Sequence, residues 1–522
     1  MVRGVSGFYS YAIFEHLENW PDLNIDESRI AFKLDDNMFN YMAISEQKQR
    51  VMPTSRDRDA GRVLAYKEAV VIRNSSDPSL NGEVDDKYQY SCDNKDNHVH
   101  GWIASSQHPH IGFWVITPSD EIRVGAPIKT DLTSHAGPIA LAIFFSNHYM
   151  GPDFGVKLRG GEHWKKVLGP VFIYLNSDSA TNHRTLWRDA RNQMLRETKK
   201  WPYDFPSSED FPNATQRGQI RGCLLLYDDY ISTHLIPARS AYVGLAPPGD
   251  DGSFQDDSKG YQFWTRADKK GFFTIQHVRA GTYNLYAWVP GVIGDFKYEE
   301  DIVIIPGSKI EIGDIVYNPP RSGPTLWEIG VPDRTAFEFY VPDPAPHLIN
   351  KLYINHTEKY RQYGLWDRYK DLYPNNDLIY TVEDSDYRKD WFFAHVTRKT
   401  SNNTYEPTTW QILFNLTNIN NVGDYTLRIA LASATMANIQ IWINEPNTSK
   451  PHFSTGRIGR DNAIARHGIH GKYWVYGVDI AGSQLVEGKN TIYLKQATGK
   501  TPFAGVMYDY IRLEAPSQQD YY

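Results

Sequence analysis

Cysteine is scarce in this 522-residue chain, which contains only Cys92 and Cys223. Two cysteines far apart in sequence do not build a disulfide framework, so small disulfide-stapled folds are excluded and no bridge is expected. No apolar run approaches the roughly 20 residues that a helix needs to cross a bilayer. The formal net charge is -7, so the chain has no basic excess for a nucleic-acid partner.

What the chain does have is length and aromatic side chains. At roughly 100–200 residues per domain, its length predicts about three domains. Aromatic residues make up 14% of the sequence, with 34 Tyr, 23 Phe and 14 Trp. This richness favours β-structure, and it also suits flat surfaces that stack on sugar rings.

The pattern along residues 1–205 predicts a β-sandwich. Short strand-like runs recur about every 10 residues, for example at 30–34, 112–116 and 171–175. One stretch, 177–200, has helical spacing of Leu186, Ala190, Met194 and Leu195 and predicts a helix. The segment 201–208 (WPYDFPSS) is typical of a linker.

Two further all-β domains are expected. Residues 214–320 alternate strands with glycine-containing turns, which predicts a second sandwich of about 100 residues. Residues 325–516 carry longer strands and end on the alternating run at 506–513, which suits a jelly roll. The predicted fold class is therefore all-β in three domains.

Common catalytic motifs are missing: there is no Walker loop, no paired CxxC, no HExxH and no GxSxG. The first candidate for chemistry is Lys87, which stands among acids and tyrosines at 83–90. A solvated ion pair is the ordinary role of such a lysine. To act as a general base it would need a lowered pKa, supplied by burial or by other cations.

The second and third candidates are histidines and an arginine. His148 follows the apolar strand at 139–145, and His135 lies in the polar loop before it. Arg50 belongs to the run QRVMP at 49–53 and has the fork that suits a carboxylate. Structural histidines and a surface arginine are the alternatives.

At these residues the chain resembles the rhamnogalacturonan lyases of polysaccharide lyase family 4, particularly the plant branch. The resemblance extends over essentially the whole chain. The motifs that carry it are GFYSYA at 7–12, QRVMP at 49–53, VDDKYQYSC at 84–92, Lys95-Asp96, VHGW at 99–102, DLTSH at 131–135, His148-Tyr149 and GPVFIYLN at 169–176.

The resemblance implies a catalytic β-sandwich, a fibronectin-III-like domain and a carbohydrate-binding-like jelly roll. It also implies eliminative cleavage of the rhamnose–galacturonic acid backbone of rhamnogalacturonan I in pectin. Lys87 matches the family's base and His148, 61 residues later, matches its acid. The positions expected to contact substrate are Arg50, Tyr88, His135, Phe144 and Phe145, the two phenylalanines standing where fungal relatives carry tyrosines.

The resemblance also sets expectations about the setting of the enzyme. The family's catalytic domain begins far upstream of the equivalent of Gly7, so an N-terminally truncated chain without a signal peptide is expected. Family members work outside the cell, at the cell wall, and six N-glycosylation sequons are compatible with secretion. A monomer with a pectic polysaccharide partner is expected, with no nucleic acid and no membrane.

No cofactor or metal site is expected, although calcium at Asp85 and Asp86 stays open. Two alternative functions also stay open. One is a non-catalytic protein that binds cell-wall polysaccharide through aromatics such as Trp327 or Trp474. The other is a glycoside hydrolase, for which no pair of carboxylates stands out.

Overall fold

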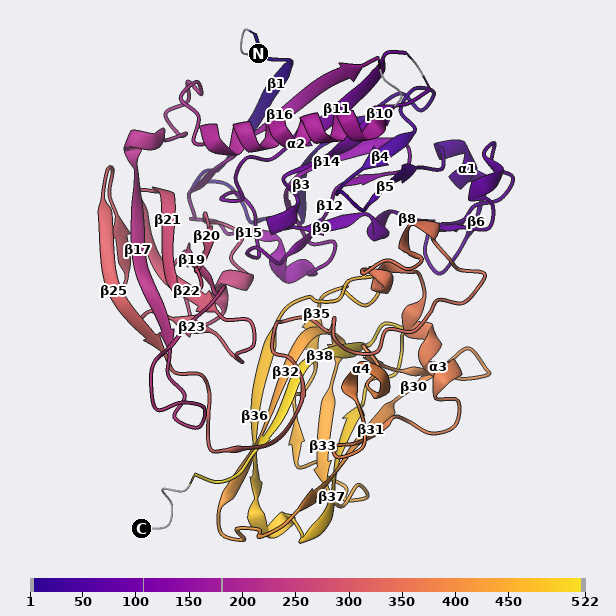
Figure 1. Cartoon of the computed structure of the whole chain (residues 1–522), viewed down its shortest axis with the longest axis vertical. Helices are drawn as coiled ribbons and strands as arrows, with labels where there is room; N and C mark the ends of the chain where they lie inside the picture. Colours follow the sequence, from indigo (N-terminus) through magenta and orange to yellow (C-terminus); the bar gives the residue numbers. More distant parts are fainter. Residues whose placement is uncertain (1–3, 107, 180–181, 518–522) are drawn as a thin grey trace.

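The computed structural model describes residues 4–106, 108–179 and 182–517 and confirms the all-β fold class. Three successive groups of sheets, here called units I, II and III, follow one another along the chain (Figure 1). Unit I lies at the top of that view, unit II at the left and unit III below. Among the described residues no helix has both the length and the apolar character to span a membrane.

Unit I is built on two sheets with a hydrophobic core that contains residues of both. The larger sheet has the order β1 (Gly7–His16), β16 (Trp164–Asp178), β11 (His110–Ile116), β10 (Val99–Ala104), β4 (Tyr41–Ala43), β5 (Gln49–Val51). The smaller has the order β13 (Ser134–His135), β14 (Ile139–Ser146), β3 (Glu27–Lys33). β10 and β14 are apolar along nearly their whole length because both of their faces are covered.

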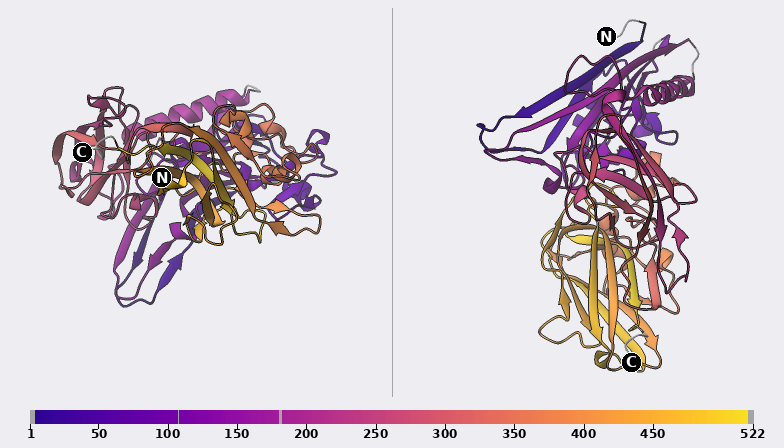
Figure 2. Two further views of the ribbon diagram at one scale, coloured as in Figure 1. Left: turned by 90° about the horizontal axis from the view of Figure 1, so that it is seen from below. Right: turned by 90° about the vertical axis from the view of Figure 1, so that its left-hand side faces the viewer.

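Three short β-ladders complete unit I. They are β9 (Ser91–Asp93) with β12 (Thr130–Leu132), β2 (Leu23–Ile25) with β15 (Val156–Leu158), and β6 (Arg62–Val63), β7 (Ala69–Val71) and β8 (Val84–Asp86) in one ladder. The one formed by β6, β7 and β8 borders unit III. β1 and β16 extend together beyond the rest of the unit (Figure 2). A short helix, α1 (Ser55–Asp59), precedes β6.

The predicted helix at 177–200 exists but starts later, as α2 (His183–Lys200). Its predicted first residues, 177 and 178, belong instead to β16, where Ser177 pairs with Ile111. Leu186, Trp187 and Ala190 bury against the large sheet, whereas Leu195 is 59% exposed. The helix therefore covers the outer face of that sheet (Figure 1) with a narrower apolar stripe than the sequence pattern indicates.

Unit II is a smaller pair of sheets around its own core. One sheet holds β17 (Arg217–Leu226), β18 (Ile236–Pro237), β21 (Phe272–Arg279) and β25 (Lys309–Tyr317), the last parallel to β17. The other holds β19 (Tyr242–Ala246), β20 (Phe263–Arg266), β22 (Gly281–Trp288), β23 (Phe296–Lys297) and β24 (Ile302–Ile304). The segment before it, predicted as a linker, packs on unit I: Tyr203 is buried and its hydroxyl donates to Glu197 Oε2 at 2.7 Å.

Unit III has two larger sheets around the most extensive core of aromatic and aliphatic residues. The first contains β26 (Thr325–Gly330), β28 (His395–Val396), β32 (Asp424–Ala437), β35 (Ile458–Arg460), β36 (Trp474–Ala481) and β38 (Gly505–Glu514). The second contains β27 (Ile379–Thr381), β31 (Thr408–Leu416), β33 (Ile439–Ile443), β34 (Phe453–Ser454) and β37 (Gly488–Gln496). β29 (Arg398–Lys399) pairs with β30 (Tyr405–Glu406), and the short helices are α3 (Tyr369–Leu372) and α4 (Tyr387–Asp390).

Units I and III share a core as well as a border. Ala69, Val71 and Val84, from β7 and β8 of unit I, pack in the same hydrophobic cluster as the core of unit III. The amide of Val84 also donates to the carbonyl of Ile349 at 2.9 Å. The strand that ends one residue before Lys87 is therefore held by unit III, which fixes the position of that lysine.

The two cysteines are buried and free, as expected: Cys92 lies on β9 of unit I and Cys223 on β17 of unit II.

Candidate functional site

Lys87 stands where β8 ends and a turn of 3-10 helix, Lys87–Gln89, begins. Asp86 caps this turn, because its Oδ1 accepts the amide of Tyr88 at 3.1 Å while Gln89 Oε1 accepts the amide of Asp86 at 3.1 Å. This reciprocal capping follows directly from the local sequence Asp-Lys-Tyr-Gln. The backbone of Lys87 is thus fixed, and its side chain is half-buried at the surface of unit I.

His148 lies just after β14, at the end of the smaller sheet. Ser146 orients it: its hydroxyl lies 2.9 Å from His148 Nδ1 and also accepts the His148 amide at 3.3 Å. On the other side, Asn462 of unit III donates from Nδ2 to the His148 carbonyl at 3.3 Å. The same Nδ1 lies 3.5 Å from Glu27 Oε1 at the start of β3.

Lys87 and His148 meet at the ring of Tyr88. Lys87 Nζ is 4.9 Å from the ring centroid, and the imidazole centroid of His148 is 6.0 Å from it. Tyr88 is only 2% exposed, so its ring is a rigid support between the two. The structure therefore brings together the two residues that the sequence singles out for catalysis.

Two arginines add positive charge to this pair. The guanidinium carbon of Arg466, from unit III, lies 3.5 Å from the Tyr88 ring centroid. Arg29 on β3 pairs with Glu27 at 2.5 Å. Glu68 Oε1 lies 3.8 Å from Lys87 Nζ. The site is thus a mixed cluster in which cations from both units surround a buried aromatic ring.

The pKa of Lys87 is lowered, chiefly by burial. The charges of Arg466 and Arg29 lower this pKa further, while Glu68 and Asp86 oppose the shift. Burial also lowers the pKa of His148 to about 3, with further contributions from Lys87, Arg29 and Arg466. Both groups are therefore driven toward their neutral forms in the unliganded protein.

A buried network behind the lysine ties the site to unit III. Asp86 Oδ2 lies 2.8 Å from His467 Nε2 and accepts the Tyr66 hydroxyl at 2.6 Å. The His467 ring stacks on Trp366 with 5.7 Å between the centroids. Burial raises the pKa of Asp86, but hydrogen bonds from His467, Tyr66 and the amide of Tyr88 outweigh it, so the pKa is lowered and the carboxylate is charged.

The remaining predicted residues differ in how they relate to this pair. His135 on β13 is half-buried, and burial lowers its pKa to about 4, with Lys87 adding to the effect. Arg50 lies elsewhere: its Nη1 donates to Glu83 at 2.9 Å and to Asn350 at 2.8 Å. Within the described residues no contact joins Arg50 to Lys87 or His148. Its contacts link units I and III.

Phe144 and Phe145 are core residues in the structure, in contrast to their expected contact with substrate. Phe144 is 2% exposed and Phe145 is 0% exposed, and both belong to the core of unit I. The Phe145 ring packs edge-on against Phe14 at 6.3 Å. A ring with no free face cannot stack on a sugar. Both are buried because both faces of β14 are covered, so that all of its residues from 140 to 146 are buried.

Sequence reasoning missed four members of the site: Arg466, Arg29, Glu27 and Glu68. None belongs to a motif, and Arg466 is 318 residues beyond His148. The only signal in the sequence was the concentration of polar residues at 461–470 in a domain otherwise rich in strands.

Asp85 and Asp86, the candidates for calcium, are occupied by protein partners. Asp85 pairs with Arg58 and accepts the Tyr90 hydroxyl at 2.6 Å. The Asp86 carboxylate accepts the Tyr66 hydroxyl and lies within hydrogen-bond distance of His467 Nε2. No group of three or more His, Cys, Asp or Glu side chains suited to a metal ion occurs in the part of the chain that the structure describes.

Three family models match the chain in order. The model of the rhamnogalacturonate lyase family matches residues 1–84. The models of polysaccharide lyase family 4 domain II and domain III match residues 238–312 and 325–513.

Curated relatives match over nearly the whole chain. A rhamnogalacturonate lyase of Dickeya dadantii is 26% identical over 99% of this chain and 78% of its own length. Rhamnogalacturonate lyase B of Emericella nidulans is 25% identical over 98% of this chain and 80% of its own length. A solved family 35 carbohydrate binding module is 18% identical over 22% of this chain and 71% of its own, with a TM-score of 0.14, too low to support an argument.

Proposed function

Because the chain belongs to polysaccharide lyase family 4, we propose that it cleaves the rhamnose–galacturonic acid backbone of rhamnogalacturonan I by β-elimination. The observation that carries the proposal is the meeting of Lys87 and His148 at one buried ring, with Arg466 and Arg29 beside them. This set supplies a base, a proton donor and cations, which are the groups that an elimination next to a carboxylate needs.

The reaction removes one proton and one leaving group from a galacturonate residue. Lys87, in its neutral form, takes the proton from C5, and the electrons of the C5–H bond form the C4–C5 double bond. The C4–O4 bond breaks, and the departing oxygen of the preceding chain takes a proton from His148. One product then begins with an unsaturated uronate, and no oxidant, reductant or water is consumed.

The lowered pKa of Lys87 supports its role as the base. A lysine is neutral only above its pKa, so burial and neighbouring cations enlarge the neutral fraction near physiological pH. The same cations serve the transition state, because loss of the C5 proton places negative charge on the uronate carboxylate. Arg466 and Arg29 would hold that carboxylate and its growing charge.

His148 needs the substrate before it can act as an acid. With a pKa of about 3 it is neutral in the unliganded site at neutral pH. Part of this lowering comes from the positive charges of Lys87, Arg29 and Arg466. A bound uronate carboxylate offsets the charges of the two arginines. Lys87 in its neutral form no longer contributes a positive charge. Substrate binding therefore raises the His148 pKa and prepares it to protonate the leaving oxygen.

The test is the ultraviolet absorbance of the unsaturated product on debranched rhamnogalacturonan I. We expect the wild-type chain to produce it, and Lys87→Ala and His148→Ala to abolish it with an unchanged circular dichroism spectrum. Lys67→Ala, an exposed lysine of the preceding loop, and His234→Ala in unit II are the matched controls and should stay active. Full activity of either site variant would refute the assignment of that residue.

The alternative of a purely binding protein is not favoured. Trp327, one of its proposed sugar platforms, is 7% exposed and packs in the core of unit III. We further infer that the enzyme acts outside the cell, where pectin is, and that it works as a monomer, since Lys87, His148 and Arg466 all come from one chain. Light scattering of the active protein tests the monomer.

A further inference from the structure

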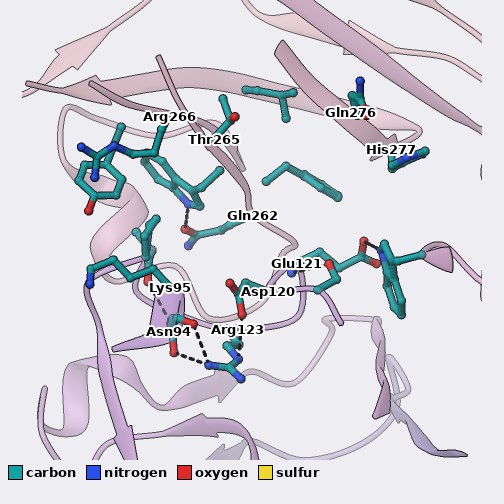
Figure 3. A pocket seen from close by; sticks show the side chains of 18 of the residues that line it. Asn94, Lys95, Asp120, Glu121, Arg123, Gln262, Thr265, Arg266, Gln276 and His277 are labelled. Carbon is teal, nitrogen blue, oxygen red and sulfur yellow. Dashed lines mark hydrogen bonds and ion pairs between the residues drawn. The ribbon is translucent and has the colours of Figure 1, made fainter. Parts of the chain in front are cut away.

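A separate cavity of about 470 Å³ lies between units I and II (Figure 3). Unit I contributes a loop that includes Asp120 and Arg123, and unit II contributes β20 and β21. Its size falls within the range of about 300–1,000 Å³ that is usual for ligand pockets. Lys87, Tyr88, His148 and Arg466 are not among its lining residues, so it is distinct from the site described above.

The lining combines a partly exposed aromatic ring, Trp264, with neutral hydrogen-bonding groups. Trp264 and Tyr242 lie on neighbouring strands of unit II, and the Trp264 indole is held by a hydrogen bond from Nε1 to Gln262 Oε1 at 2.9 Å. Thr265 next to Arg266, together with Gln276 and His277 further along, also lines the cavity (Figure 3). Flat rings beside hydroxyl and amide groups are the means by which proteins hold a sugar ring.

The cations at this cavity differ in their pairing: Lys95 pairs with Asp93 and Asp96, and Arg123 pairs with Asp120. Arg266 lies flat over the Tyr242 ring, 3.9 Å from its centroid, and no carboxylate of the described residues forms an ion pair with it. Next to the cavity, the Glu121 carboxylate pairs with two buried guanidiniums. Its Oε2 lies 2.6 Å from Arg217 and its Oε1 lies 2.8 Å from Arg279. Arg266 is therefore the cation that this cavity offers to an anion.

The cavity continues into a second one of about 830 Å³ that reaches unit III. The two share four lining residues, Lys95, His98, Tyr242 and Arg266. Unit III contributes Phe337, Tyr360 and His470 to the second cavity. Together the two cavities form a trough with walls from all three units, and Arg266 lines both parts. This shape suits a chain molecule better than a single compact ligand.

We propose that this trough is an accessory binding site for an acidic oligosaccharide, with a uronate carboxylate at Arg266 and a sugar ring on Trp264. It would hold part of the polymer away from the bond that is cleaved. The class of ligand rests on the proposed function, whereas the site itself rests on the geometry of the trough.

The test measures binding of tetragalacturonate to the full-length protein by isothermal titration calorimetry. This probe contains uronates but no rhamnose linkage, so the proposed reaction does not consume it. Two exposed positions are changed: Arg266→Ala removes the unpaired charge, and Thr274→Trp fills the cavity from β21. The matched controls are Arg239→Ala and Thr282→Trp, also exposed on unit II but outside the trough. Thermal melting verifies that all four variants fold.

We expect Arg266→Ala and Thr274→Trp each to weaken binding about tenfold, the size of one charge-assisted contact, and the controls to bind as wild type does. Equal affinity in wild type and both trough variants would overturn the inference, as would no binding by wild type. Product formation is measured separately. A chain that forms no product but binds through Arg266 would refute the proposed lyase function and support the accessory site. A chain that forms product but does not bind tetragalacturonate would support the lyase function and refute the accessory site.

Discussion

Arg466 lies over the ring of Tyr88, 3.5 Å from guanidinium carbon to ring centroid, although 378 residues separate the two in sequence. Tyr88 belongs to unit I and follows Lys87 directly, whereas Arg466 comes from the polar loop of unit III. Lys87 and His148 therefore have the Arg466 charge beside them only when units I and III are joined. Under the proposed mechanism, unit III would then contribute to catalysis.

Replacing Arg466 by Gln should move the pH dependence of kcat/KM to higher pH. The base form of Lys87 increases as pH rises through its pKa, and the Arg466 charge lowers that pKa. Removing the Arg466 charge raises the pKa of Lys87, so activity begins at a higher pH. The rate at neutral pH should also fall roughly 10²-fold, the usual cost of losing one group that stabilises charge in the transition state. Arg466→Lys keeps a positive charge and should leave the pH dependence of kcat/KM unchanged. If Arg466→Gln also leaves it unchanged, the Arg466 charge does not set the pKa of Lys87.

Replacing Glu68 by Gln should shift the same pH limb in the opposite direction. The Glu68 carboxylate lies 3.8 Å from Lys87 Nζ and raises its pKa. Without it the pKa of Lys87 falls, and the neutral amine is available at lower pH. Initial rates of ultraviolet product across a pH series test this prediction. An upward shift, or none, would show that Lys87 is not the group that titrates.

Replacing Arg50 by Ala should reduce stability and leave KM for the polymer unchanged. Its guanidinium forms a two-point pair with Glu83, at 2.9 and 3.2 Å, and also donates to Asn350 of unit III. Losing charged hydrogen bonds of this kind costs about 1.5–3 kcal/mol each. Denaturant unfolding and steady-state kinetics on one preparation separate the two effects. A raised KM with unchanged stability would restore Arg50 as a substrate contact, as the resemblance implied.

The sequence predicted the chain's fold class and the two residues that meet at the site, for reasons that are local. Strand alternation and glycine turns are local patterns, and Lys87 and His148 sit in motifs of adjacent residues. Arg466 was beyond such reasoning because its role depends on how unit III docks on unit I. The burial of Phe144 and Phe145 was beyond it for a related reason: it depends on the elements that cover both faces of β14, which no single strand encodes.

Replacing Asp86 by Asn should loosen units I and III from each other and reduce activity, although the Asp86 side chain is fully buried. Its carboxylate accepts from Tyr66 at 2.6 Å and lies 2.8 Å from His467, and it also caps the turn that begins at Lys87. Losing hydrogen bonds to a buried carboxylate costs about 1.5–3 kcal/mol each. Because the folded-state pKa of Asp86 is lowered, its contribution is present above the unfolded pKa and is lost as pH falls through the folded value. Wild type should thus lose more stability than Asp86→Asn when denaturant unfolding is repeated below pH 4; equal losses would show that this carboxylate does not hold the units together.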